Sequence, residues 1–509
     1  MITNAEIAKI FSQTADLLEI KGENPFKVRA YRNTSKLIEN SSKDFEKLVK
    51  EGFDLTRLPG IGNDLSTYIK EIVTIGKFSK LEKLKKEIPQ GLINMLSIEG
   101  LGPKRVKQIY DAFGVSSLDE LRKYALNGEL DKLPGFGPKL IQKILKGIKQ
   151  LKKAGIRFLW AEVEEFAEDL RKYLLGFDGV EIVEIAGSYR RKKETVGDLD
   201  ILVVAKDYPK VIEYFIKYPK IKEIQSAGLT RSTVFLENDL QVDLRAVMAE
   251  SYGAALHYFT GSKAHNIEIR KIAIEKDMKV NEYGVYKNDK KIAGKSEEEV
   301  YKAVGLCYIE PELRENRGEI ESCINNSLPN LVKLEDIKGD LNISADLIDE
   351  AVNLGYKYVG VNKKIKRDDI KVYKILEVDV NNFEIKEDYD FLVGIVNEDA
   401  KTENILKSLE KVNFLRFFRD IKTKKELKVD FEKIFEEMKN KNVILEVVSR
   451  PNNLISEVLI NAAINKGVKI SVVSNAKNKK ELNLKYGINQ SRRGWAENKD
   501  VINVSDNPF

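Results

Sequence analysis

Cysteine is almost absent from this chain of 509 residues, which contains only Cys307 and Cys323. So few thiols argue against a disulfide framework and a cysteine-rich zinc site, and they favour a reducing compartment. No apolar run approaches the roughly 20 residues that a membrane-spanning helix needs, and the first residues predict an amphipathic helix rather than a secretion signal. We therefore expect a cytoplasmic protein with inert or buried thiols and no membrane partner.

An excess of one charge is also lacking. The net charge is only +6, from 86 basic and 80 acidic side chains, so the total says little about partners. The length is more informative, because it exceeds the usual size of a single hydrophobic core and predicts three or more structural units. The function must therefore be read from local motifs.

The most informative segment is Gly187-Ser188-Tyr189-Arg190-Arg191, followed by Gly197-Asp198-Leu199-Asp200. Asp198 and Asp200 lead into an apolar run, so on a strand both carboxylates point to the same face. A third carboxylate, Asp243, lies in the strand-like run 241–245. Three carboxylates on neighbouring strands predict a site for two Mg²⁺ or Mn²⁺ ions, and the Gly-Ser turn with its arginines suits a phosphate.

The motifs G-S-Y-R-R-x₆-D-x-D and Q-V-D-L-R resemble the palm of the family X DNA polymerases, of the bacterial and archaeal type with a DNA polymerase beta-like core. A second match lies downstream: Tyr258-Phe259-Thr260-Gly261-Ser262, Asn266 and Arg270 resemble the family's nucleotide pocket. The resemblance is close as far as Asn316 and looser beyond it.

The resemblance implies a role for each of these residues. Asp198 and Asp200 would hold both cations, and Asp243 would bind the catalytic cation and help to activate the primer hydroxyl. Tyr258 and Phe259 would pack against the sugar, Asn266 would reach the base edge, and Arg270 would approach the template. The full predicted nucleotide site is Gly187, Ser188, Arg191, Gly197, Tyr258, Phe259, Gly261, Ser262, Asn266 and Arg270.

An internal repeat precedes the palm, at residues 58–62, 98–102 and 133–137. In each copy two glycines flank an apolar residue, which allows a tight turn and a following helix whose first amides face a DNA phosphate. Three copies predict helix-hairpin-helix modules, which bind the backbone without reading sequence. The predicted DNA contacts are Gly60, Gly62, Gly100, Gly102, Gly135, Gly137, Lys104 and, in the palm, Arg245. We also expect Na⁺ or K⁺ to bind at the hairpin turns.

The first domain departs from its relatives at one position. In some family members it removes a sugar-phosphate remnant through a Schiff-base lysine, but here that position is Tyr68, and Asp64 stands where another lysine is common. Lys70 would face elsewhere on the helix. We therefore expect no lyase activity and a role in binding the 5′ side of a gap.

Residues after about position 318 alternate between apolar strand-like runs and helices, which predicts an α/β domain. Its framework resembles the polymerase-and-histidinol-phosphatase (PHP) domain, a metal-dependent phosphoesterase barrel. That resemblance places its ligand positions at Asn342, Ser344, Lys363, Lys364, Asn397, Asn475 and Lys477, none of which is histidine or carboxylate, and leaves only Glu377.

The chain's two histidines, His257 and His265, both lie upstream of this domain. An ammonium has no lone pair with which to bind a cation. We therefore expect a degenerate domain without metal or nuclease activity, and we hypothesise that Lys364 or Lys477 pairs with Glu377.

The predicted fold class is multidomain α+β, with helical hairpin modules, a palm with a mixed sheet, an α/β thumb-like subdomain and a C-terminal α/β barrel of the PHP type. The expected domains are residues 1–90 and 91–150 for DNA binding, 151–250 for the palm, 251–318 for the nucleotide pocket and thumb, 319–334 for a linker, and 335–509 for the PHP-like domain.

We predict a DNA-directed DNA polymerase that extends a primer 3′-hydroxyl at short gaps, as in base excision repair. Its expected partners are gapped or primed DNA and deoxynucleoside triphosphates. We further expect a monomeric, prokaryotic protein associated with the nucleoid through DNA. Two alternatives stay open, namely a template-independent nucleotidyltransferase and a non-catalytic DNA-binding repair scaffold.

Overall fold

A computed structural model describes residues 4–39, 41, 43, 45–75, 78–154, 156–385, 387–419, 421 and 427–509. The chain divides into two compact units, residues 1–156 and 157–509. No helix in the described ranges is both long and apolar enough to span a membrane.

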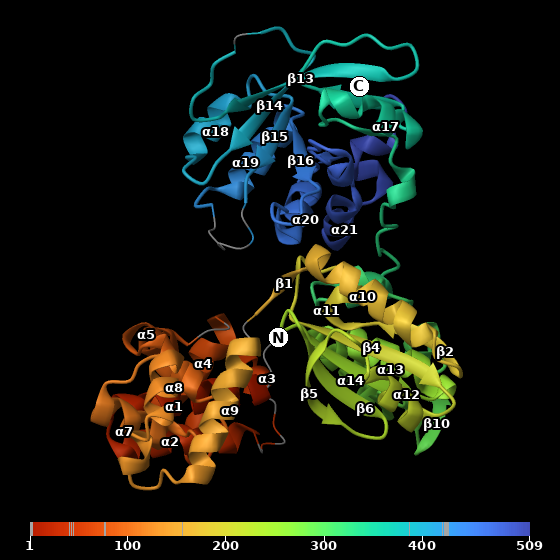
Figure 1. The fold of residues 1–509 in the computed structure, drawn as a ribbon. Helices are drawn as coiled ribbons and strands as arrows, with labels where there is room; N and C mark the ends of the chain where they lie inside the picture. Colours follow the sequence, from red (N-terminus) through yellow and green to blue (C-terminus); the bar gives the residue numbers. More distant parts are fainter. Residues whose placement is uncertain are drawn as a thin grey trace. The chain divides into compact units, whose positions relative to one another are not determined.

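The first unit is helical (Figure 1). Its helices are α1 (Asn4–Lys21), α2 (Pro25–Glu39), α3 (Phe45–Lys50), α4 (Asn63–Ile75), α5 (Ser79–Glu87), α6 (Gln90–Met95), α7 (Pro103–Phe113), α8 (Leu118–Leu126) and α9 (Pro138–Ala154). One continuous apolar core runs through these helices, and it includes the hairpin residues Ile61, Leu101 and Phe136. The apolar residue of each glycine turn therefore anchors the turn inward.

The second unit begins with the palm. Its elements are β1 (Phe158–Leu159), α10 (Trp160–Leu175), β2 (Val180–Ile185), α11 (Gly187–Arg190), β3 (Thr195–Val196), β4 (Asp198–Ala205), α12 (Tyr208–Phe215), β5 (Ile221–Ala227), β6 (Arg231–Leu236) and β7 (Gln241–Val247). The sheet order is β2-β4-β7-β6-β5. Only the β4–β7 pair is parallel, so the sheet is mixed, as predicted.

The thumb-like subdomain follows directly. It contains α13 (Tyr252–Thr260), α14 (Lys263–Glu275), α15 (Glu297–Ala303), α16 (Glu319–Ile324) and the antiparallel strands β8 (Met278–Asn281), β9 (Gly284–Lys287) and β10 (Lys290–Ala293). Its core joins α13, α14 and α15 through Ala254, Ile269 and Val300.

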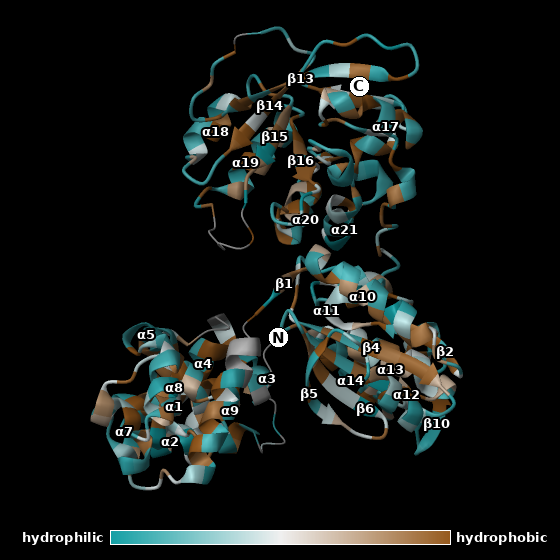
Figure 2. Cartoon of the chain, viewed as in Figure 1, coloured by the Kyte–Doolittle hydropathy of each residue, from teal (hydrophilic) through white to brown (hydrophobic). Residues whose placement is uncertain are grey.

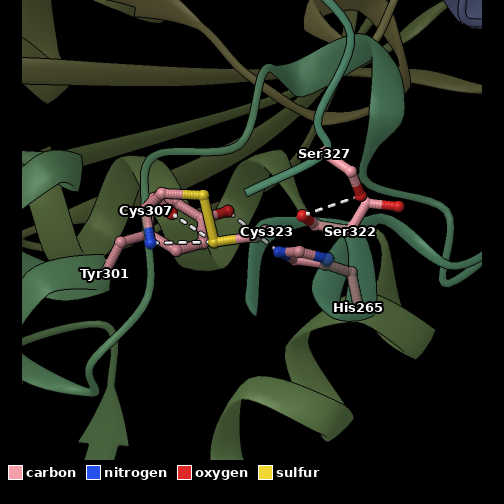
Figure 3. Close-up of a disulfide and its surroundings, with 6 residues drawn as sticks. All are labelled: His265, Tyr301, Cys307, Ser322, Cys323 and Ser327. Carbon is pink, nitrogen blue, oxygen red and sulfur yellow. Dashed lines mark hydrogen bonds between the residues drawn. A yellow bond between two sulfur atoms is a disulfide. The ribbon is translucent and has the colours of Figure 1, made fainter. Parts of the chain in front are cut away.

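The two cysteines correct one expectation from the sequence. Cys323, on α16, forms a disulfide with Cys307, and their Cα atoms are 5.8 Å apart (Figure 3). The amide of Cys307 also donates to Cys323 Sγ at 2.8 Å. The composition could not reveal this pair, because the thumb fold brings together residues that are 16 positions apart.

The C-terminal domain is a parallel barrel that is nearly closed. Its strands are β11 (Gly339–Asp340), β12 (Tyr358–Val361), β13 (Lys371–Asp379), β14 (Phe391–Val396), β15 (Phe414–Phe417), β16 (Ile444–Val448) and β17 (Ile470–Val473), adjacent in that order. Its helices are α17 (Ile348–Asn353), α18 (Thr402–Ser408), α19 (Phe431–Asn440), α20 (Glu457–Asn465) and α21 (Lys485–Arg493).

Contacts between the first and last strands bring the sheet back on itself. A parallel bridge joins Ile343 to Ala476, and the Asn503 amide donates to carbonyls of both Gly339 and Val472. The strands β12, β15 and β17 are buried at every position, whereas β13 also has exposed residues. Most residues of β16 are apolar, as Figure 2 shows. Largely buried strands are typical of parallel sheets, and the parallel strand order confirms the predicted α/β barrel.

Candidate active site

The three predicted aspartates lie on the two parallel strands of the palm. In the β4–β7 register Asp200 is opposite Asp243, and Asp198 is opposite Gln241. Leu199 and Ile201 alternate with the aspartates and are buried in the core. The period of two therefore turns all three carboxylates towards one face of the sheet.

The electrostatics of this face disfavour three free negative charges. Burial, followed by repulsion from Asp198 and Asp243, raises the pKa of Asp200 to about 7. Burial and Asp243 also raise the pKa of Asp198. A divalent cation would remove this penalty, and carboxylate oxygens are the ligands that Mg²⁺ and Mn²⁺ prefer. The donor set thus fits such an ion.

Asp243 is held by its own strand and by the neighbouring one. It accepts hydrogen bonds from the Thr233 hydroxyl and, at 2.6 Å, from the Gln241 side chain. Across the described ranges no three Asp, Glu, His or Cys side chains form a finished metal cluster. The palm nevertheless places three carboxylates on adjacent positions of one sheet face, each with further lone pairs for a cation.

A cavity of about 540 Å³ opens beside Asp198 and Asp200. Most of the predicted nucleotide residues line it, namely Gly187, Ser188, Arg191, Tyr258, Phe259, Gly261, Asn266 and Arg270. Gly197 and Ser262 do not line it: Gly197 lies against Arg157, and Ser262 caps α14 by accepting from the His265 amide. Asp243 lies outside the lining as well.

Gly187 is required where the phosphate-facing turn meets the carboxylates. Its φ is +60°, a conformation that favours glycine. A Cβ at this position would collide with the Asp200 carboxylate. The turn can therefore approach Asp200 only because residue 187 has no side chain.

Part of the cavity lining is aromatic and basic. The Arg270 guanidinium lies 5.3 Å from the Tyr258 ring centroid. Arg245 lies outside the lining, with its guanidinium 4.5 Å from the Phe259 centroid. The Asn266 amide donates to the Tyr258 carbonyl at 2.8 Å, and its buried Oδ1 has no hydrogen-bond partner among the described residues. An aromatic face beside an acceptor without a partner suits a sugar and a base edge.

Sequence reasoning missed four residues that also line the cavity, Arg157, Lys193, Lys263 and Ile267. Arg157 donates to the Thr195 hydroxyl and carbonyl, at 2.9 and 2.6 Å, and lies beside Gly197. Lys263 directly follows Ser262 and Lys193 lies two positions after Arg191, so their closeness to predicted motifs could have indicated them. Arg157 precedes the palm motif by 30 positions and gave no such signal.

In the first unit, the glycine hairpins have the expected backbone. Gly60, Gly100 and Gly135 have φ of +85°, +90° and +83°. Apart from its chain neighbours, no atom of the described residues lies within 4 Å of a Cβ built on Gly62, Gly102 or Gly137. A cavity of about 590 Å³ next to the second hairpin contains Gly102 and Lys104 together with Arg29, Arg32 and Arg105. Open backbone with nearby cations is suited to phosphates.

The Tyr68 position has a basic neighbour that the sequence did not reveal. Lys80 Nζ lies 5.4 Å from the Tyr68 ring centroid and donates to the Tyr31 hydroxyl at 2.8 Å. Burial lowers the pKa of Lys80. Tyr68 itself stacks on Tyr31, with ring centroids 6.2 Å apart.

The hypothesis that Lys364 or Lys477 pairs with Glu377 is wrong, because Glu377 has other partners. Glu377 accepts from Arg416 at 2.7 Å and from Asn342 at 2.8 Å, whereas Lys364 pairs with Asp388 at 3.6 Å. Burial would raise the pKa of Glu377, but Arg416 and Asn342 lower it below its ordinary value. Lys477 adds only a smaller charge effect in the same direction. The guanidinium comes from β15, next to β14 and two strands from Glu377, so no local spacing pointed to it.

Comparisons with known proteins agree with this arrangement. Family models match at residues 157–272 (DNA polymerase beta palm), 255–315 (DNA polymerase beta thumb), 2–78 (helix-hairpin-helix domain) and 92–150 (SAM-like helix-hairpin-helix tandem). The DNA polymerase/3′-5′ exonuclease PolX of Bacillus subtilis is 30% identical over 98% of this chain and 97% of its own length.

Two further relatives match shorter parts. DNA polymerase lambda of rat is 26% identical over 54% of this chain and 51% of its own length. The repair DNA polymerase X of African swine fever virus is 31% identical over 25% of this chain and 78% of its own length.

The palm and thumb, with carboxylates beside a basic and aromatic cavity, define a nucleotidyltransferase of the DNA polymerase class. The similarity to the Bacillus subtilis polymerase over almost the full length identifies the family within this class. The chain belongs to the family X DNA polymerases, of the bacterial type, and is a DNA-directed DNA polymerase.

Proposed function

We propose that this polymerase fills short gaps during DNA repair by adding deoxynucleotides to a primer 3′-hydroxyl. The observation that carries the proposal is the cavity beside Asp198 and Asp200, whose lining combines Gly187, Ser188 and Arg191 with Tyr258 and Asn266. This combination of groups suits a triphosphate, a sugar and a base.

In this proposal each group of residues has one task. Asp198, Asp200 and Asp243 hold two Mg²⁺ or Mn²⁺ ions, which supply charge stabilisation for in-line phosphoryl transfer. Gly187, Ser188 and Arg191 orient the β- and γ-phosphates, and Gly197 and Ser262 shape the backbone around them. Tyr258, Phe259, Gly261, Asn266 and Arg270 position the sugar and base.

The DNA would be held mainly through its backbone. Gly60, Gly62, Gly100, Gly102, Gly135 and Gly137 present helix amides to phosphates, and Lys104 and Arg245 add charge. Na⁺ or K⁺ would bind at the hairpin turns. We propose no lyase chemistry, because Tyr68 carries no amine that could form a Schiff base.

Primer extension on single-nucleotide-gapped DNA tests the assignment. Asp243→Ala should lower the rate about a thousandfold, because loss of a cation ligand removes several kcal/mol of transition-state stabilisation at ~1.4 kcal/mol per factor of ten. Asp207→Ala is the matched control, since Asp207 is a palm aspartate that caps α12 and pairs with Lys210, and it does not line the cavity. Full activity in Asp243→Ala would refute the proposed site.

A further inference from the structure

The last helix of the C-terminal domain contacts the phosphate-facing turn of the palm. Arg493, at the end of α21, donates through Nη1 to the carbonyl oxygen of Arg191 at 2.8 Å. The same Nη1 lies 3.3 Å from Glu315 Oε1, and Nη2 donates to Glu457 at 2.8 Å. The Arg493 side chain is only 1% exposed. A buried guanidinium from one domain thus ends on the backbone of a residue that lines the nucleotide cavity.

The side chain of Arg191 is held by the same network. Its Nε donates to Glu315 Oε1 at 3.0 Å, and its Nη1 donates to the Thr260 carbonyl at 2.5 Å. One oxygen of Glu315 therefore bridges Arg191 and Arg493. Burial alone would raise the pKa of Glu315, but the charges of Arg191 and Arg493 hold it below its ordinary value.

A second pair of contacts holds the other end of this segment. Glu194 lies three positions after Arg191 and four before Asp198. Its Oε1 accepts from Arg419 at 2.9 Å and from Gln490 at 2.8 Å, and both donors belong to the C-terminal domain. The carbonyl of Glu194 accepts from the Trp160 amide at 2.9 Å. The segment 191–194, which connects the phosphate-facing turn to the carboxylates, is thus held at both ends from the C-terminal domain.

We propose that Arg493 is a positioning residue for nucleotide addition. By fixing the Arg191 carbonyl and the shared Glu315, it holds the Arg191 guanidinium where the triphosphate of an incoming nucleotide binds. The inference rests on the proposed function and gives the C-terminal domain a task that needs no metal of its own. Small displacements of a group that must meet a phosphate are costly, because fixed geometry supplies much of the rate.

The test uses the full-length chain and single-nucleotide-gapped DNA, with kcat and the KM for the deoxynucleoside triphosphate measured separately. Arg493→Ala should raise that KM about tenfold, as expected for loss of an interaction that aids ligand binding, and leave the affinity for gapped DNA unchanged. The KM of Arg493→Lys should lie between those of the wild type and Arg493→Ala, because an ammonium keeps the charge but cannot match the forked geometry of a guanidinium. It is also the variant to measure if Arg493→Ala does not fold.

Arg492→Ala is the matched control from the same helix and interface. Arg492 donates to Glu312 at 2.9 Å and to the Val332 carbonyl at 3.0 Å, and neither of these hydrogen bonds involves the segment 191–194. Its removal should leave the KM for the nucleotide within about twofold, although both variants lose an interface hydrogen bond worth ~1 kcal/mol. An equal rise in KM for both variants would reduce Arg493 to a structural role and overturn the proposal.

A double-mutant cycle gives an independent readout. If Arg493 acts through Arg191, the effects of Arg191→Lys and Arg493→Ala should combine to less than their product. Multiplicative effects, or an unchanged KM in Arg493→Ala, would overturn the positioning role while leaving the proposed function intact. A wild-type chain that extends no primer would overturn both.

Discussion

Glu297 of the thumb forms an ion pair with the palm residue Arg190. Its carboxylate accepts from Arg190 of the palm at 2.7 Å and from Arg314 at 2.5 Å. The Arg314 side chain is fully buried, and Glu297 is 4% exposed. Burial opposes ionisation of Glu297, but the two guanidinium groups lower its pKa to about 2.

Glu297→Gln should therefore destabilise the protein by about 3–5 kcal/mol at neutral pH, because it leaves two buried cations without their carboxylate. Denaturant unfolding of the full chain measures this. The carboxylate's pKa is lower in the folded state, so its contribution is complete above its ordinary pKa of 4.5 and is lost as pH falls towards 2. The difference between wild type and variant should shrink over that range. A difference that is constant with pH would contradict the ion-pair explanation.

The sequence alone reveals some of these residues and not others. Asp198, Asp200 and Arg191 could be predicted because each belongs to a short motif whose spacing has a physical meaning. Glu297, Glu315 and Arg493 could not, because they reach the site over 107, 124 and 302 positions from their palm partners. Such pairs depend on how domains pack, and no local pattern encodes that.

At the level of elements, the two glycines of each hairpin turn have different structural requirements. The first glycine of each turn needs its positive φ, so replacing it strains the backbone. The second has no such need: Gly102 has a φ of −80° and precedes α7 as its N-cap. The backbone of Gly102 therefore does not require glycine, and the proposed approach of a DNA phosphate to the exposed amides supplies another reason for its small size.

Gly102→Ala should fold normally, since an added Cβ would meet no atom of the described residues within 4 Å beyond its chain neighbours. It should weaken binding of gapped DNA about fivefold, as expected for the loss of one phosphate hydrogen bond of ~1 kcal/mol. Fluorescence anisotropy at fixed salt measures the affinity, and thermal unfolding serves as the control for folding. Gly62→Ala and Gly137→Ala are parallel tests. Unchanged affinity with all three alanines present would contradict a role for these turns in DNA binding.

The hairpins were predictable as elements because three copies share one local setting, with apolar anchors at Ile61, Leu101 and Phe136. The disulfide between Cys307 and Cys323 was not, because a count of two cysteines carries no information about their distance. A repeated local motif can be recognised in a sequence, whereas a single contact between distant residues has no local sequence pattern.

At the scale of the whole molecule, the C-terminal barrel contains a buried ion-pair network that includes Asn342 and Glu377, two of the positions that the PHP resemblance predicts at its ligand site. Arg416 is buried between Glu377 and Glu446, with distances of 2.7 and 2.6 Å to their carboxylates. Asn342 donates to the same oxygen of Glu377. Glu377 therefore already has a fixed cationic partner, and a guanidinium offers no lone pair to a metal.

The full-length protein should consequently leave a 5′-labelled, mismatched primer intact when incubated with Mn²⁺ and no nucleotide, although the relative in Bacillus subtilis is named an exonuclease as well as a polymerase. The same preparation should extend a matched primer once nucleotides are added, which shows that the protein is active. Asp243→Ala separates the sites, because any shortening that persists in this variant cannot depend on the palm. Shortening that persists there and disappears in Glu377→Ala would show that the barrel still hydrolyses DNA, and that Arg416 does not replace the metal.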